Sequence, residues 1–215
     1  MKWKERVYKY IESRVIVFEE RRKQSALKNL KQEIVHNGIL LEGYTINLPS
    51  LPIITKYPGS TFSIGNNCVL LGSSSENPAG ISHPCVLATL TNTATLIIGD
   101  NVGISGASIC CVNSIHIGDY VNLGVGVRIY DTDFHPLDYF ERRKNPGFNL
   151  DKIPHAPIKI GNDVWIGAAS IILKGVVLGD RVIVAAGSVV TKSFPADCII
   201  GGNPARVIRG EVNNI

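Results

Sequence analysis

The sequence lacks a long hydrophobic run, since no apolar stretch reaches the roughly 18 residues that a membrane-spanning helix needs. Its first ten residues, MKWKERVYKY, also lack the apolar core of a secretory signal peptide. The chain has 215 residues, of which 45% are hydrophobic, so it is long enough to bury a sizeable core. We therefore expect one main globular domain with a short extra segment.

Paired cysteines are missing as well. The five cysteines form no CxxC pair and have no histidine partner at zinc-finger spacing. An odd number without a pattern favours reduced thiols in a cytoplasmic protein, where most of them would fill the core as small side chains. No metal site is expected.

Charge is scarce outside the N-terminus. Residues 1–31 hold ten lysines or arginines against four glutamates, and their spacing predicts an amphipathic helix. Such a helix could pack on the domain with its charges in water, or it could make weak contact with an anionic membrane surface. Aromatic residues do not alternate with the basic ones as a base-stacking platform would need, so we expect no nucleic-acid partner.

What the sequence does contain is a short repeat. An aliphatic residue, Gly and then Asp or Asn occur together five times, beginning at Ile64, Ile98, Ile117, Ile160 and Leu178. Between Ile160 and Val190, aliphatic residues fall at steps of six. This period fits neither a helix nor an ordinary strand, and it predicts a parallel β-helix of hexapeptide repeats in which three rungs of six close one coil. We expect the aliphatic residues inside, and Gly, Asn and Asp in left-handed corner conformations.

The spacing of the repeat also shows where the chain leaves the coils. Ile160 and Leu178 are one coil of 18 residues apart, whereas Ile117 and Ile160 are 43 residues apart. The excess must leave as a loop, which the polar, proline-containing segment 131–157 supplies. A second loop is expected from Gly72 to Pro84. The predicted organisation is a basic helix over 1–31, a β-helix over 32–193 with loop 131–157 extruded, and a cap over 194–215.

The second half of the chain resembles a known family. Its segments are Asp163–Ala168 (DVWIGA), Ala186–Lys192 (AGSVVTK), Gly202–Arg209 (GNPARVIR) and Asp131–Pro136 (DTDFHP). In order and spacing these are similar to the hexapeptide-repeat O-acetyltransferases, which include galactoside, maltose and cell-surface polysaccharide acetyltransferases. The resemblance implies a left-handed β-helix, a homotrimer with sites between subunits, acetyl-CoA as acyl donor and a sugar or polysaccharide precursor as acceptor. A cytoplasmic enzyme, peripheral at the inner membrane face if residues 1–31 touch lipid, would fit these expectations.

Three residues are candidates for the chemistry. His135 lies at the root of the long loop, and an imidazole can take a proton from a hydroxyl near neutral pH. The resemblance gives it the role of catalytic base. Asp133, two residues earlier, is the first choice to orient the imidazole, with Asp131 as the alternative, although either could instead cap a turn. Ser105 falls where related sugar acetyltransferases place an Asn that stabilises the oxyanion, and it could equally be a turn serine or bind acceptor.

The resemblance also implies a coenzyme A groove between two prisms. Ala168 and Ala186 are small enough to let the pantetheine arm lie close to the backbone, and Trp165 would flank it. The phosphate and adenine end is assigned to four residues with polar or cationic side chains: Thr191, Lys192, Arg206 and Arg209.

Three other functions compete with this one. A zinc hydratase on the same prism needs three converging imidazoles, but His116, His135 and His155 are 19 and 20 residues apart. A non-catalytic scaffold and an acetyltransferase for an antibiotic or other small molecule also remain as alternatives.

Overall fold

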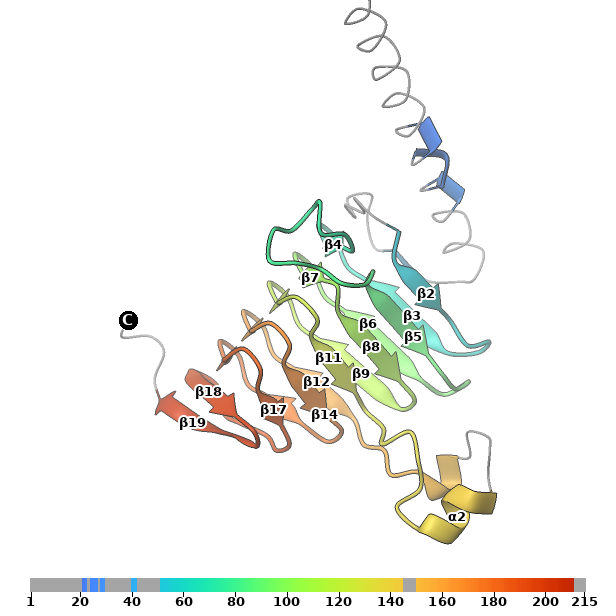
Figure 1. Cartoon of the computed structure of the whole chain (residues 1–215), viewed down its shortest axis with the longest axis vertical. Helices are drawn as coiled ribbons and strands as arrows, with labels where there is room; N and C mark the ends of the chain where they lie inside the picture. The colour runs from blue at the N-terminus through green and yellow to red at the C-terminus, as the bar shows by residue number, and fades with distance from the viewer. Residues whose placement is uncertain are drawn as a thin grey trace, which may run out of the picture.

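The computed structural model describes residues 21–22, 24–26, 28–29, 40–41, 51–144 and 150–210. Within this part of the chain the strands form three sheets, which are the three sides of a prism (Figure 1). Sheet A holds β1 (Leu40–Leu41), β3 (Thr61–Ile64), β6 (Thr95–Ile98), β9 (Ser114–Ile117), β12 (Ile158–Ile160) and β15 (Val177–Leu178).

Sheets B and C complete each coil. Sheet B holds β4 (Val69–Leu71), β7 (Gly103–Ser105), β10 (Asn122–Leu123), β13 (Trp165–Ile166), β16 (Ile183–Val184), β18 (Cys198–Gly202) and β19 (Ala205–Gly210). Sheet C holds β2 (Ile53–Thr55), β5 (Val86–Thr89), β8 (Ser108–Cys111), β11 (Arg128–Tyr130), β14 (Ile171–Leu173) and β17 (Val189–Val190). The chain passes from A to B to C and returns to A. The fold is a left-handed parallel β-helix, for which the repeat predicts the coils and the resemblance implies the hand.

The core is a set of aliphatic columns. Side chains alternate along each rung, so every second residue points inward and packs on its equivalents in the next coils. All six residues of the regular stretch are at most 1% exposed: Ile160, Ile166, Ile172, Leu178, Val184 and Val190. Cys68, Cys85, Cys111 and Cys198 are buried free thiols in the same core, as expected from their lack of pattern.

The A-to-B corners differ in one respect from the prediction. The glycine is required by close approach rather than by φ, because a Cβ on Gly118 would meet the backbone of Gly161 and the Oδ1 atom of Asn162. The left-handed residue is the one that follows the Asp or Asn, with φ between 55° and 60° at Asn67, Asn101, Tyr120, Asp163 and Arg181. A single αL residue is enough to turn the chain, and the side chain before it is then free to act as a cap.

These caps join one coil to the next. The backbone N–H of Asn66 donates to Asp100, that of Asp100 to Asp119, that of Asp119 to Asn162 and that of Asn162 to Asp180, at N···Oδ1 distances of 2.6–2.9 Å. Four successive corners therefore have a backbone N–H satisfied by a side chain of the following coil.

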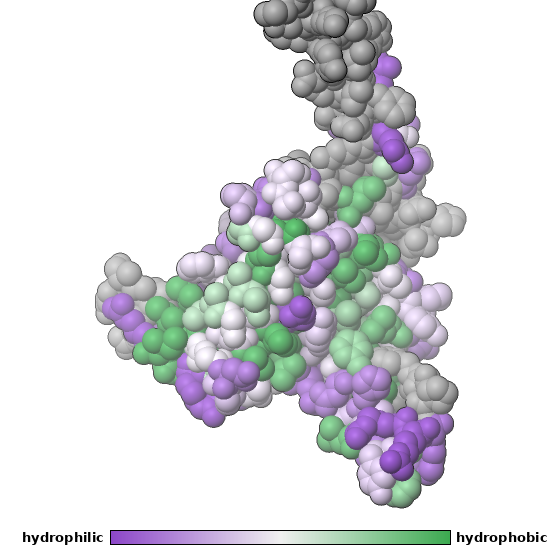
Figure 2. Space-filling view, viewed as in Figure 1, coloured by the Kyte–Doolittle hydropathy of each residue, from purple (hydrophilic) through white to green (hydrophobic). Residues whose placement is uncertain are grey.

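Two segments leave the prism at different corners. Residues 72–84 join β4 to β5 at the B-to-C corner. Residues 131–157 join β11 to β12 at the C-to-A corner and contain helix α2 (Tyr139–Lys144) and a 3₁₀ turn (Leu150–Lys152). In Figure 1 this second segment projects from the stack, and Figure 2 shows hydrophilic residues gathered over it.

The C-terminal end continues the prism further than residue 193. Phe194 forms a bridge with Leu178 of sheet A, and β18 pairs parallel with β16 of sheet B. The repeat is hard to see here because Phe194 follows Val190 after four residues rather than six, yet Phe194, Cys198 and Ile200 are buried. Strand β19 then pairs antiparallel with β18 and covers the last edge of sheet B, as a cap should.

The outer faces differ in polarity. Sheet A presents Ser63, His116 and Lys159 among its outward residues. The outward row of sheet C holds the half-buried Val86, Ile171 and Val189, together with Ile53, Ser108 and the exposed Arg128. The N-terminal helix predicted over 1–31 lies largely outside the described residues, although the described positions between 21 and 29 are helical. None of the helices among the described residues combines the length and the hydrophobicity that crossing a bilayer requires.

Candidate active site

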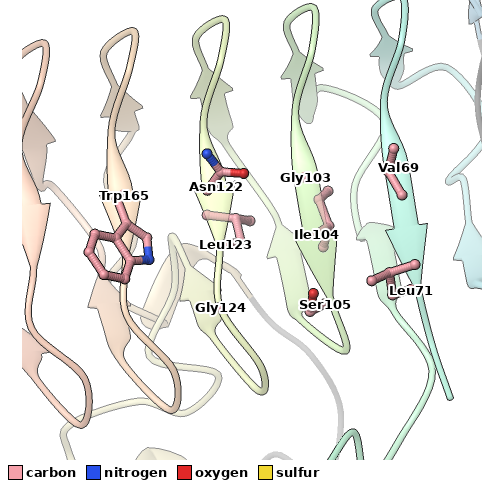
Figure 3. A pocket seen from close by; sticks show the side chains of 9 residues that line it. All are labelled: Val69, Leu71, Gly103, Ile104, Ser105, Asn122, Leu123, Gly124 and Trp165. Atoms are coloured by element: carbon pink, nitrogen blue, oxygen red, sulfur yellow. The ribbon is translucent and has the colours of Figure 1, made fainter. Parts of the chain in front are cut away.

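A groove runs along the outer face of sheet B. It has a volume of about 430 Å³ and opens between β4, β7, β10 and β13 (Figure 3). Across the strands, Val69, Gly103, Asn122 and Trp165 are register partners in one row, and Leu71 and Ser105 pair in the next. Trp165 is 55% exposed at the C-terminal side of the groove, and its predicted contact with the coenzyme stays a prediction.

Beyond the groove, small residues occupy successive strands of sheet B. Gly124 donates to Ile166, Gly167 to Val184 and Ala185 to Ile200 through backbone N–H groups, so these residues follow Ser105 along the edge of sheet B. A Cβ on Gly124 would meet the backbone of Ala168, and one on Gly167 would meet the backbone of Ala186. Ala168 and Ala186 are exposed on successive B-to-C corners.

Ser105 is held by the loop that precedes it in the stack. The Asn77 side-chain amide donates to the Ser105 hydroxyl at an Nδ2···Oγ distance of 3.2 Å. The Asn77 side-chain oxygen in turn accepts from the backbone N–H of Ala79 at 2.9 Å. Sequence reasoning missed Asn77, because nothing in residues 72–84 marks one polar side chain of this loop above the others.

His135 lies at the start of the extruded segment, where it is exposed. The residue before it, Phe134, has φ of 60°, and its ring stands edge-on to Tyr130 with the ring centroids 5.2 Å apart. The backbone N–H of Phe134 donates to the Thr132 hydroxyl. Aromatic packing and a tight turn thus hold the backbone on which the imidazole is carried.

Asp133 pairs with a lysine that the sequence did not single out. Its carboxylate accepts from Lys174 Nζ at 2.6 Å, and both side chains are partly exposed. Lys174 follows β14, one coil beyond β11, so the ion pair ties the loop root to the next coil. Whether Asp133 also orients His135 stays a prediction.

Asp131 has the capping role that was the alternative for it. It is fully buried, and its two carboxylate oxygens accept from the backbone N–H groups of Val112 and Asn113, each at 2.8 Å. Burial raises the pKa of Asp131, and the two N–H donors oppose that shift. The Cys111 thiol also donates to Asp131, and burial raises the pKa of that thiol. This carboxylate therefore fixes the loop root and does not face a ligand.

The residues assigned to the coenzyme tail lie in two places. Thr191 and Lys192 are exposed after β17 at the C-to-A corner, where Lys192 Nζ stands 5.5 Å from the centre of the Phe194 ring. Arg206 and Arg209 are exposed on β19, at the far end of sheet B.

The predicted site residues thus divide into two sets on one chain. The first set follows sheet B and the B-to-C corner, and it consists of Ser105, Trp165, Ala168, Ala186, Arg206 and Arg209. The second set follows the C-to-A corner, and it consists of Asp133, His135, Thr191 and Lys192. Sheet C separates the two sets, so a single chain does not bring the base and the groove together. Among the described residues, no group of three or more His, Cys, Asp or Glu side chains is placed to hold a metal ion.

Comparison with known proteins agrees with the fold. Residues 157–192 match the family described as "Hexapeptide repeat of succinyl-transferase". The sequence is 41% identical over 101 residues to the galactoside O-acetyltransferase of Escherichia coli, covering 47% of this chain and 46% of that protein. It is 38% identical over 124 residues to a putative acetyltransferase of Saccharomyces cerevisiae, covering 54% and 56% of the two chains. The chain spans about half the length of these curated relatives.

Solved structures give the same architecture. A hexapeptide-repeat acetyltransferase of Vibrio cholerae, in complex with acetyl coenzyme A, matches with a TM-score of 0.51 at 25% identity, over 87% of this chain and 77% of that one. AntD, an N-acyltransferase of Bacillus cereus in complex with dTDP and coenzyme A, matches with a TM-score of 0.61 at 23% identity, over 84% and 88%, and this likeness shows the fold alone.

The stacked coils and these matches define the class of protein, which is a left-handed β-helix built from hexapeptide repeats. Within that class the chain is similar to the O-acetyltransferases, as its motifs predict.

Proposed function

We propose that this protein transfers an acetyl group from acetyl-CoA to a hydroxyl of a sugar, which is part of a cell-surface polysaccharide or its precursor. The observation that carries the proposal is the division of the site residues between two edges of the prism. One edge offers a groove, small residues on the strands beyond it and two arginines at the far end of sheet B, and the other offers the exposed His135 and Lys192. Relatives named for sugar acetylation and a structural neighbour in complex with acetyl coenzyme A support the choice of donor and acceptor.

A cyclic trimer would bring the two edges together. If the C-to-A corner of one copy lies against sheet B of the next, then His135 and Lys192 of one copy face the groove of its neighbour. The same contact repeated three times closes a ring. The half-buried side chains of Val86, Ile171 and Val189 lie on a face of sheet C that such packing would cover.

In the proposed site the groove takes the long arm of acetyl-CoA. From β7 to β18 there are four strand spacings, which is roughly 19 Å along the stack. Arg206 and Arg209 at one end would hold the phosphates by charge-assisted hydrogen bonds, and the thioester would lie near Ser105 at the other end.

The proposed chemistry needs one base. The His135 imidazole takes the proton of the acceptor hydroxyl as the hydroxyl oxygen attacks the thioester carbonyl carbon. A tetrahedral oxyanion forms, its C–S bond then breaks, and the departing thiolate takes the proton back from the imidazolium. The products are the acetyl ester and coenzyme A with a free thiol.

The test is acetyl-CoA turnover against a panel of sugars and lipid-linked oligosaccharides, with simple amines and antibiotics included for the alternative acceptors. The His135→Ala variant should keep its size in sedimentation and lose nearly all transfer, and His155→Ala, which changes another exposed histidine of the same segment, should keep it. If His135→Ala retains a rate within about tenfold of wild type, equivalent to roughly 1.4 kcal/mol of barrier, His135 is not the base. A monomer in sedimentation would contradict the shared site.

A further inference from the structure

The loop at residues 72–84 is packed against the Ser105 end of the groove. The Ile81 side chain is 7% exposed, and a Cβ on Gly106, the residue after Ser105, would meet both Ile81 and the carbonyl of His83. The loop is also tied to itself, since the backbone N–H of Gly72 donates to the Glu76 carboxylate. It is therefore a well-supported wall beside Ser105.

Asn77 projects from this wall onto the Ser105 hydroxyl, and its amide can face only one way. The Ala79 N–H is a donor and fixes the Asn77 oxygen toward itself, which leaves the NH₂ group facing Ser105. Ser105 must then accept the hydrogen bond. The Ser105 hydroxyl proton therefore points away from Asn77, and within residues 51–144 and 150–210 this proton has no acceptor.

We propose that Asn77 is a positioning residue that holds Ser105 as a hydrogen-bond donor toward the groove. The inference rests on the proposed function, in which the oxygen of the thioester carbonyl becomes negatively charged beside Ser105. A donor that is already oriented stabilises this charge without reorganisation during the reaction. Accepting from Asn77 also polarises the Ser105 hydroxyl and makes it a stronger donor.

The sharpest variant is Asn77→Asp. It has the same shape and keeps an acceptor for the Ala79 N–H, but it puts a carboxylate oxygen where the NH₂ group was. The Ser105 proton is then drawn to Asp and away from the groove. We expect kcat to fall about 10²-fold, the size typical for loss of one oxyanion donor, with a much smaller change in KM for acetyl-CoA.

Three further variants separate this role from a structural one. Ser105→Ala should lose as much kcat as Asn77→Asp, and the double variant should be no worse than Ser105→Ala. Ser73→Ala, which removes the Ser73–Ser75 contact within the same loop, should leave kcat unchanged. Thermal melting of each variant should stay close to wild type.

The outcomes are distinguishable. If wild type transfers acetyl groups and His135→Ala does not, but Asn77→Asp stays within twofold of wild type, the inference is wrong and the proposed function stands. A double variant far below Ser105→Ala would mean that the added charge, and not the Ser105 proton, causes the loss, which also overturns it. If wild type transfers to no acceptor, the proposed function fails and takes the inference with it.

Discussion

Replacing Asp131 by Asn tests the capping role of a carboxylate that could have been mistaken for a catalytic group. The wild-type side chain uses both oxygens, one for the N–H of Val112 and one for the N–H of Asn113. Asn has one oxygen, so one of the two backbone N–H groups would face an NH₂ group. The lost bond to a charged acceptor is worth roughly 1.5–3 kcal/mol, and the unpaired N–H costs about 1 kcal/mol more. Relief of carboxylate desolvation offsets part of this, leaving a net loss of about 2 kcal/mol.

The matched control is Asp138→Asn. Asp138 also accepts from two backbone N–H groups, those of Phe140 and Glu141, but through the same oxygen, Oδ1, at the start of α2. Asn keeps that oxygen and is as good an N-cap as Asp, so this variant should be nearly neutral. Urea unfolding at equal protein concentration compares the two, and with a slope of 1–3 kcal/mol per M the Asp131→Asn midpoint should fall by about 1 M.

The pH dependence of the free energy of unfolding gives a second test of Asp131. Because burial raises its pKa, the folded protein holds this proton more tightly than the unfolded chain. Its protonated form therefore adds stability below the ordinary aspartate pKa of about 3.9, and that contribution is lost as pH rises through the folded value. Asp131→Asn should lack this part of the pH dependence. Equal effects of the Asp131 and Asp138 variants, at any pH, would refute the two-oxygen argument.

Three other outcomes follow from the packing. Gly118→Ala should destabilise the folded protein by about 3 kcal/mol, because its Cβ would meet the backbone of the next coil. Gly210→Ala has open space around its Cβ and should not change stability. Equal urea midpoints for the two variants would contradict the close-approach argument. Ile171→Arg should lower the oligomer size in sedimentation by placing a second cation beside Arg128, its register partner on sheet C; an unchanged size would remove this face from the interface. Asp133→Asn should cost less than about 1 kcal/mol, since its partner Lys174 is partly exposed, and a fall in kcat without a fall in stability would assign Asp133 to His135.

Much of the fold was predictable because each six-residue repeat in the sequence corresponds to one rung of the β-helix. The aliphatic steps of six became the buried columns, and the excess between Ile117 and Ile160 became the segment with α2. The prediction weakened where a local change hid the period. The short step from Val190 to Phe194 made the last coil look like a separate cap, although its backbone still pairs with the prism.

The site was harder to predict because chemistry on a prism depends on the corner, not on the order along the chain. Counting the six-residue rungs along the sequence could have shown that His135 follows a strand of sheet C and that Ser105 lies in a strand of sheet B. The two residues would then be expected to lie apart. The same counting could not have found Asn77 or Lys174, because their partners, Ser105 and Asp133, lie 28 and 41 residues away and no period relates them.

The corner caps can form only in a fixed order while the chain is being synthesised. Each cap is supplied by the coil that follows, through Asp100, Asp119, Asn162 and Asp180. At the equivalent position of the coil that stacks on Gly179 the chain has Ala196, whose side chain has no acceptor. During translation, the corner N–H of the newest coil therefore lacks its acceptor until the next coil has been synthesised. Where the extruded segment intervenes, the wait between Asp119 and Asn162 is 43 residues, about twice that of an ordinary coil. A stalled nascent chain should be most sensitive to protease during that interval, and least once β19 has closed on β18.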